Sequence, residues 1–214
     1  MTENRQGRRL GHGALLAIVL LAWALLPVTP ARAGLPATGQ TTPNTADKNN
    51  GVGLDAVPDD GTLQRGATLH YKLLNNGTIK DLNTGLIWEM KCSGAGCAPL
   101  HDVSNLYRWS GDGTQETIWD WLEDVNAEGG TGYAGRDDWR IPNVRELQSI
   151  VDYGVFFPPI DPIFGPTAVS LYWSSTTGAV SPSDAWFVIF GLGSVNADGK
   201  SNTLSVRAVR GGPK

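Results

Sequence analysis

The chain has 214 residues, 41% of them hydrophobic, and a formal net charge of −4. This length permits one medium-sized domain with extensions, and the acidic balance excludes a general binder of nucleic acid or other polyanions. Two cysteines and three widely separated histidines exclude a cysteine-rich zinc module.

The N-terminus has the three parts of a secretory signal peptide. Arg5, Arg8 and Arg9 form a basic region, residues 14–26 are an uninterrupted apolar run, and Ala-Arg-Ala at 31–33 fits a cleavage site. The apolar run is too short for a stable transmembrane helix, and no later stretch is long enough to replace it. We therefore expect an exported protein that does not span a membrane and that is secreted, periplasmic or displayed at the cell surface.

Removal of residues 1–33 makes the remainder more acidic, because the 17 Lys and Arg fall to 13 while the 21 Asp and Glu fall to 20, a formal net charge of −7. Residues 34–66 are polar, lack apolar periodicity and predict an extended lead-in to a folded domain of residues 67–214. Oxygen-bearing side chains in the lead-in suggest calcium, but their spacing fits no complete calcium loop, and turn formation explains them more simply: Asp47, Asn49, Asp55, Asp59 and Asp60.

Strand-like alternation begins at Leu69. Residues 69–74 and 78–81 predict a hairpin in which Asn-Gly at 76–77 supplies the positive φ angles of a tight turn. A further strand is predicted over residues 86–90.

Cys92 and Cys97 enclose only four residues. In an oxidising compartment we expect them to form a disulfide that trims a local loop. A redox or metal-binding dithiol is the alternative, which the four-residue spacer and the lack of partner ligands disfavour.

The stretch 98–113 has no regular pattern and contains several aromatic and charged side chains. Aromatic rings in a polar loop can stack on sugar rings while neighbouring polar groups bind hydroxyls. The alternative is that the tryptophan packs the loop onto the domain. The candidate ligand-binding residues are Tyr107, Arg108, Trp109 and Asp112.

A first helix is predicted over residues 116–126. Ile118, Leu122 and Val125 recur at intervals of three and four residues and form a stripe to be buried. The acidic side chains between them are more simply a solvated face than a catalytic pair: Asp120, Glu123 and Asp124.

A second helix begins at Asn143, an N-cap residue whose partner in a capping box is Glu146. Trp139 and Arg140 stand just before it. Burying an arginine requires a paired carboxylate, and Asp138 and Glu146 are the nearest. We therefore predict structural roles for Trp139, Arg140 and Glu146, with a ligand-binding arginine as the alternative.

The rest of the chain predicts a proline-punctuated apolar loop followed by an antiparallel sheet. The aromatic side chains of the loop, residues 156–164, either cover the core or form a partner surface. Residues 185–190 are apolar on both faces and should be a central strand, and residues 196–199 predict a hairpin turn. The predicted strands are residues 171–177, 185–190, 193–195 and 204–210.

Several stretches together resemble the signature of the Lcl C-terminal domain family, named for a bacterial collagen-like adhesin: residues 76–88, 138–147, 172–176, 185–188 and 206–210. The resemblance implies a C-type-lectin-like α+β fold, with two helices packed against a small antiparallel sheet whose first and last strands lie close together. Family members often carry Cys where this chain has Ala208, so a disulfide to the last strand is not expected.

The expected function is non-catalytic recognition of a glycan or of an envelope or extracellular protein, with a role in adhesion. A structural or assembly module of the bacterial envelope is the alternative. An enzyme is disfavoured because the zinc-protease, P-loop, dinucleotide and nucleophile-elbow motifs are missing. Formylglycine-generating relatives use cysteines late in their domain, whereas Cys92 and Cys97 lie early. We assign no catalytic residue, metal ligand or cofactor.

Sulfated glycans are the ligand class that the resemblance suggests. The net charge of −7 opposes such binding unless basic side chains gather in one place. The candidates for that basic patch are Arg136, Arg145, Arg207, Arg210 and Lys214.

Overall fold

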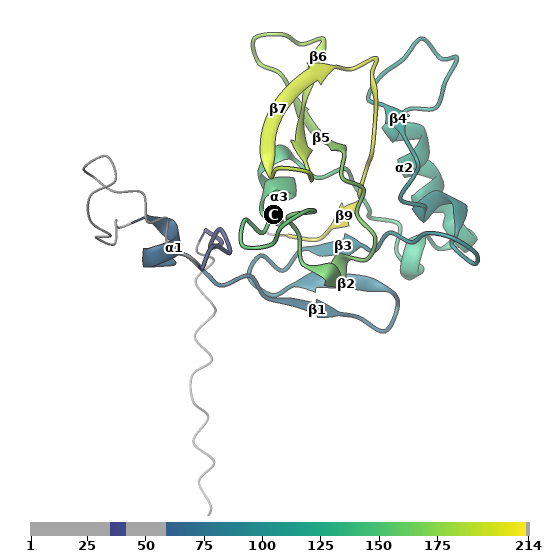
Figure 1. Ribbon diagram of the computed structural model, residues 1–214. Coiled ribbons are helices and arrows are strands. Elements are labelled where there is room, and N and C mark those ends of the chain that lie inside the picture. Colours follow the sequence, from purple (N-terminus) through teal and green to yellow (C-terminus); the bar gives the residue numbers. More distant parts are fainter. Residues whose placement is uncertain (1–34, 42–58, 213–214) are drawn as a thin grey trace, which may run out of the picture. The chain divides into compact units, whose positions relative to one another are not determined.

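The computed structural model describes residues 35–41 and 59–212, so the predicted signal peptide lies outside the described residues. The described chain is a mixed α and β structure with antiparallel sheets and few helices (Figure 1). Its α-helices are α1 (Asp60–Leu63), α2 (Ile118–Ala127) and α3 (Val144–Gln148), and its 3-10 helices span Pro99–His101, Glu128–Gly130, Tyr133–Gly135 and Pro162–Phe164. None of the helices in this part of the chain has the length and apolar character needed to cross a bilayer.

The strands form three antiparallel sheets. One has the order β1-β2-β3-β9, one pairs β4 with β8, and one has the order β5-β6-β7. Their bounds are β1 Tyr71–Leu73, β2 Thr78–Asp81, β3 Ile87–Glu89, β4 Tyr107–Arg108, β5 Leu171–Thr177, β6 Asp184–Ile189, β7 Ser194–Gly199, β8 Thr203–Leu204 and β9 Val209–Arg210.

The predicted hairpin is present as β1 and β2. Gly77 has φ +76°, whereas Asn76 keeps a negative φ, so only the glycine needs the left-handed region. At the other end of the domain, β9 pairs with β3, where Trp88 lies opposite Val209. The last strand therefore joins the sheet of the first strands, but at the edge opposite β1.

The sheet β5-β6-β7 confirms one prediction and corrects two. The stretch at 185–190 is central, since β6 lies between β5 and β7. Residues 196–199 do not turn but continue β7, because their backbone stays in register with β6. The predicted strand 204–210 is interrupted and supplies β8 and β9 to two different sheets.

Helix α3 packs against β5 and β6. In Figure 1 it lies between the sheet β5-β6-β7 and the sheet that contains β3. The predicted capping box is present, because Asn143 accepts from two backbone N–H groups of the first turn and Glu146 accepts from the Asn143 N–H. The helix ends at Gln148, yet the predicted apolar stripe beyond it, Ile150 and Val151, is still buried.

Helix α2 begins two residues later than predicted. Thr117 is its N-cap and forms a capping box with Asp120, which places Glu116 outside the helix. Ile118 and Val125 of the predicted stripe are buried together with Trp121, whereas Leu122 is only half-buried. The buried side chains belong to a core cluster that also includes Trp139 and Trp173, and a second cluster surrounds Trp88 and Phe164.

The described parts of the lead-in are bound to the domain. Ala37 N–H donates to the Ala67 carbonyl at 2.8 Å, and Tyr153 N–H donates to the Thr38 carbonyl at 2.7 Å. The short helix α1 follows, with the Asp59 side chain as its N-cap. The calcium candidates Asp47, Asn49 and Asp55 lie outside the described residues.

Candidate functional site

The loop between β3 and α2 carries the candidate ligand-binding residues, and it starts with a disulfide. The predicted Cys92–Cys97 bond is present, with the two Cα atoms 5.4 Å apart. The Cys92 N–H donates to the His101 carbonyl at 3.0 Å, and the Val103 N–H donates to the Cys92 carbonyl at 2.9 Å. The start of the loop is therefore closed on itself by one covalent bond and two backbone hydrogen bonds.

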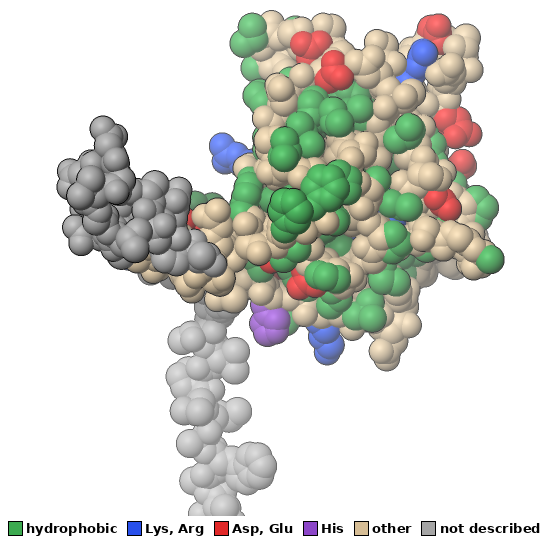
Figure 2. Space-filling view, viewed as in Figure 1, with side chains coloured by type: hydrophobic (Ala, Val, Ile, Leu, Met, Phe, Trp, Pro, Cys, Tyr) green, Lys and Arg blue, Asp and Glu red, His purple; other side chains and the backbone are tan. Residues whose placement is uncertain are grey.

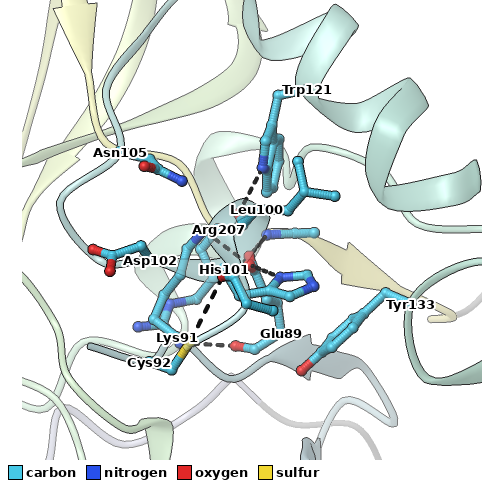
Figure 3. Close-up of polar contacts among 12 residues, drawn as sticks. Glu89, Lys91, Cys92, Leu100, His101, Asp102, Asn105, Trp121, Tyr133 and Arg207 are labelled. Carbon is cyan, nitrogen blue, oxygen red and sulfur yellow. Dashed lines mark hydrogen bonds and ion pairs between the residues drawn. The ribbon is translucent and has the colours of Figure 1, made fainter. Parts of the chain in front are cut away.

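Beneath this loop lies a buried ionic group that we call the Glu89 cluster: Glu89, Lys91, His101 and Arg207 (Figure 3). Glu89 Oε1 lies 2.8 Å from Lys91 Nζ and 2.7 Å from His101 Nδ1. Glu89 Oε2 accepts from the Ala208 N–H at 2.8 Å. Ions removed from water cost several kcal/mol each unless they are paired, so these contacts are required for the loop to close over them.

His101 links the cluster to the end of α2. Its Nε2 lies 3.1 Å from Glu128 Oε2, and its ring lies 4.0 Å from the ring of Tyr133. Burial disfavours the imidazolium, but the hydrogen bonds and charges of Glu89 and Glu128 outweigh it and raise the pKa of His101. A histidine whose two nitrogens both face carboxylates satisfies both contacts only when both nitrogens carry a proton.

The charges of Glu89 and Lys91 differ in how far their partners compensate for burial. Burial alone would raise the pKa of Glu89, but Lys91 and His101 lower it to about 2. Burial lowers the pKa of Lys91, and the charge of Glu89 opposes that shift only in part. Lys91 Nζ contacts Glu89 but lacks the geometry of a hydrogen bond, and its other neighbour is the ring of Trp121. We conclude that the carboxylate is the best-satisfied charge of the cluster.

Arg207 is one of the candidates for a basic patch, and the structure excludes it. Its Nη1 donates to the carbonyls of Glu89 and Phe164 at 2.8 and 3.0 Å, and Nη2 donates to Thr167 Oγ1 at 2.9 Å. The residue is fully buried. It is therefore a structural side chain that ties β9 to β3 and to the loop after α3.

The remaining basic candidates differ in how available their charges are. Arg210 donates to both carboxylate oxygens of Asp138 at 2.6 and 3.0 Å. Arg136 and Arg145 are exposed, and Lys214 lies outside the described residues. The predicted basic patch therefore loses Arg207, which is buried, and the charge of Arg210 is neutralised by Asp138.

The predicted structural residues near α3 lie together. Arg140 donates two hydrogen bonds of 2.7 Å to the Glu146 carboxylate, so the predicted ion pair forms. Trp139 is buried, and its indole N–H donates to the Tyr133 carbonyl at 2.9 Å. Asp138, the other candidate partner for Arg140, is used by Arg210 instead.

The structure separates the four candidate ligand-binding residues. Tyr107 is buried against Trp121, and its carbonyl accepts from the Trp173 indole N–H at 3.0 Å, so its side chain packs in the core. Arg108 and Asp112 line an open groove. Trp109 is half-buried and lies beside that groove.

Trp109 is held by contacts with three neighbouring residues. Its indole N–H donates to the Ser174 carbonyl at 2.9 Å, which packs the loop onto β5. Lys200 Nζ lies over the ring, 3.9 Å from its centroid. The edge of the ring meets Trp119, whose centroid is 5.0 Å away and which is 37% exposed. Trp119 is consequently the more accessible aromatic surface.

The groove has a volume of about 580 Å³. It lies between the loop after β4, the chain before β6 and the turn after β7, and its wall is polar. The lining residues are Arg108, Ser110, Gly111, Asp112, Pro182, Ser183, Asp184, Gly199, Lys200 and Ser201.

The charges in the groove are unequally satisfied. Among the described residues, neither Arg108 nor Lys200 has a carboxylate within ion-pair distance, and the buried Arg108 Nε has no hydrogen-bond partner. Lys200 Nζ donates only to Thr177 Oγ1, at 3.0 Å. By contrast, Asp112 accepts from the N–H and hydroxyl of Thr114, and these bonds lower its pKa. The groove therefore offers cations more readily than anions.

Sequence reasoning missed Trp119, Asp184 and Lys200. Trp119 could have been recognised from the sequence, because it falls on the outward face of the predicted helix. Lys200 and Asp184 could not have been recognised, since each lies in an ordinary polar stretch of sequence. The pairing of β6 with β7 brings them to the groove.

The described residues include no group of three or more His, Cys, Asp or Glu side chains arranged to hold a metal ion. Of the calcium candidates within them, Asp59 accepts from the Thr62 N–H at 2.9 Å, and Asp60 accepts from the Thr38 hydroxyl. Asp59 therefore caps α1, and Asp60 joins α1 to the segment at Thr38.

The loop at 156–164 is divided between core and surface. Ile160 and Phe164 are buried in the cluster around Trp88, whereas Phe156 and Phe157 are 94% and 55% exposed. The second half of the loop thus covers the core, as predicted, and the exposed first half leaves the partner surface a prediction.

Comparison with known families gives one match. The family model described as the Lcl C-terminal domain matches residues 77–210, more than half of the chain. No curated protein matches the sequence. The matched region contains β2 to β9, and with them the Glu89 cluster and the groove.

Proposed function

This chain belongs to the Lcl C-terminal domain family, and from the groove beside Trp109 we propose that it is an exported, non-catalytic recognition domain that binds a glycan. The same proposal assigns the domain a C-type-lectin-like architecture. Small antiparallel sheets with α2 and α3 against them, and β9 in the sheet of the first strands, support that assignment. Domains of this kind tolerate varied loops, so the ligand has to be argued from the groove itself.

The observation that carries the proposal is that one groove contains two cations, Arg108 and Lys200, with no carboxylate of the described residues within ion-pair distance. A guanidinium and an ammonium held near each other bind an acidic group with charge-assisted hydrogen bonds. Ser110, Ser183 and Ser201 line the same groove and offer hydroxyls to the hydroxyls of a sugar. Trp119 meets Trp109, and in this proposal its exposed ring is the stacking surface.

The charge balance narrows the glycan class. Asp112 and Asp184 line the groove together with the two cations, so its formal charge is balanced. A densely sulfated chain would meet these carboxylates and an acidic surface, which costs affinity. A saccharide with isolated acidic groups on otherwise neutral sugars fits better.

Export and the absence of catalysis are parts of the same proposal. The N-terminal basic and apolar segments and the Cys92–Cys97 disulfide support a destination in an oxidising compartment. The non-catalytic assignment is supported by the burial of Glu89 and His101, because paired titratable groups serve catalysis where a substrate reaches them.

The test is a glycan-array screen of the purified protein, followed by calorimetric titration of the strongest ligand. Lys200→Ala and Trp119→Ala should each weaken binding at least tenfold, about 1.4 kcal/mol. Lys72→Ala removes the same charge from an exposed position on β1 and is the matched control. Binding that both groove variants leave intact would place the ligand elsewhere, and no binding at any salt concentration would reject glycan recognition.

The second candidate function, an assembly module, is favoured by the exposure of Phe156 and Phe157. Large apolar side chains at the surface of a secreted domain mark contact sites with other proteins. This surface is distinct from the groove, and the two functions are compatible.

A further inference from the structure

Exposed apolar side chains gather on one face of the domain. Two connections form it, the loop after α3 and the turn between β6 and β7. The Tyr153 hydroxyl donates to the Gly193 carbonyl at 2.6 Å, which holds these connections together. Figure 2 shows hydrophobic side chains gathered at the middle of the face it presents. We call this surface the Phe156 face: Tyr153, Phe156, Phe157, Val169 and Leu192, which are 38%, 94%, 55%, 45% and 76% exposed.

The loop that carries the two phenylalanines is held in place from beneath. The Asp152 N–H donates to the Pro159 carbonyl at 2.9 Å, and Ile160 is buried in the core. Phe157 has φ +50°, a conformation that costs a bulky residue about 1–3 kcal/mol and persists only where surrounding structure holds it. The exposed rings are therefore presented by an ordered backbone, so that binding to them requires little further ordering.

A hollow lies directly beside the exposed rings. Its volume is about 360 Å³, and it is lined by uncharged residues: the exposed rings of Phe156 and Phe157 form part of its wall, and Ile160, Pro162 and Pro166 form another part. The same small region thus carries a projecting apolar group, Phe156, and an apolar cavity. A surface that holds both an apolar projection and an apolar hollow can pair with an identical surface across a two-fold axis, which requires self-complementarity.

We propose that the Phe156 face binds the same face of a second copy of this chain and forms a symmetric dimer, with Phe156 of each copy in the hollow of the other. The hollow is lined without charged side chains, so two copies can meet there despite the negative net charge of each.

The area available fits a weak dimer. The three exposed aromatic rings offer roughly 400 Å² per copy, and Leu192 and Val169 extend the surface. A symmetric pair would bury on the order of 1,000 Å² in total, the lower limit for a specific interface. We therefore expect association that depends visibly on concentration.

The test is sedimentation velocity of the full chain, expressed in a bacterium that exports it, from about 5 to about 500 μM, where interfaces of this size dissociate. The protein should shift from monomer to dimer over this range. Phe156→Ser should weaken association at least tenfold. Val180→Ser is the matched control, because Val180 is as exposed as Phe156 but lies in the connection between β5 and β6.

The outcomes separate clearly. A wild-type chain that stays monomeric throughout overturns the proposal, as does association that Phe156→Ser and Val180→Ser weaken equally. Leu192→Ser, on the turn between β6 and β7, is a second and independent test of whether the Phe156 face mediates association. Phe156→Ser should leave glycan affinity unchanged, so a failure of this inference and a failure of the proposed function are distinguishable.

Discussion

Glu89 and His101 meet in the core with Oε1 and Nδ1 2.7 Å apart, and this contact joins β3 to the loop that carries one wall of the groove. His101 continues to Glu128 at the end of α2. The cluster therefore connects three segments through charged groups that have almost no contact with water. Its integrity should decide both the stability of the domain and the position of the loop.

Replacing Glu89 by Gln should destabilise the protein severely. The change leaves Lys91 and Arg207 as buried cations without a carboxylate and His101 with Glu128 as its remaining carboxylate, and breaking such a group costs about 3–5 kcal/mol. Denaturant unfolding monitored by tryptophan fluorescence measures the loss. Glu123→Gln, on the exposed face of α2, removes the same charge and should change stability by less than about 0.5 kcal/mol. Equal effects of the two changes would contradict a structural role for the cluster.

Stability should fall in acid because of Glu89. Its pKa is lowered to about 2 in the folded protein from an ordinary value of 4.5. A carboxylate with a depressed folded pKa contributes stability that is present above the unfolded pKa and is lost as the pH falls through the folded value. The loss should develop between about pH 5 and 2 and amount to roughly 3 kcal/mol. Unfolding curves across this range measure it, and a Glu89→Gln chain that still folds should show a flatter pH dependence.

His101 should act in the opposite direction. Its pKa is raised above 6.5 by Glu89 and Glu128, despite burial, so its contribution is fully present below pH 6.5 and is lost as the pH rises through the folded value. Direct titration by NMR of the imidazole signals should give a midpoint above that of a free histidine. His101→Gln should remove the corresponding decline in stability. A midpoint below 6.5 would mean that burial, not the two carboxylates, controls the ring.

The cap of α3 offers a prediction of smaller size. The Asn143 side chain accepts from the N–H groups of Arg145 and Glu146, both at 2.9 Å. Asn143→Ala should therefore cost about 1 kcal/mol and lower the Tm by about 2–4 °C for a chain of this length. Asn143→Asp keeps an acceptor at the cap and should retain most of the stability. Thermal scans of the three proteins under identical conditions provide the comparison.

The disulfide should matter locally. Cys92–Cys97 closes a loop of sequence separation five, for which chain entropy gives about 2 kcal/mol. Cys92→Ser combined with Cys97→Ser should lower the Tm by several degrees while the far-ultraviolet circular dichroism spectrum stays unchanged. Complete unfolding of the double variant would show that the bond holds more than its own loop.

Local features could be predicted from the sequence because their partners are close along the chain. Asn143 and Glu146 are three residues apart, and the turn at Gly77 and the Cys92–Cys97 bond need only neighbouring residues. The central position of β6 followed from its apolar character on both faces. The family followed from several such stretches in a fixed order.

The tertiary structure decided which charges are available. Arg207 and Arg108 look alike in the sequence, yet Arg207 is buried on carbonyl oxygens while Arg108 faces a groove without an ion-pair partner among the described residues. Glu89 reaches the Ala208 N–H across a separation of 119 residues. The sequence by itself determined the first hairpin, the cap of α3, the disulfide and the family, because short-range geometry specifies them. Burial and long-range pairing determined the groove, the Glu89 cluster and the exposed Phe156 face, because the energy of a charge or an apolar ring depends on what the fold places around it.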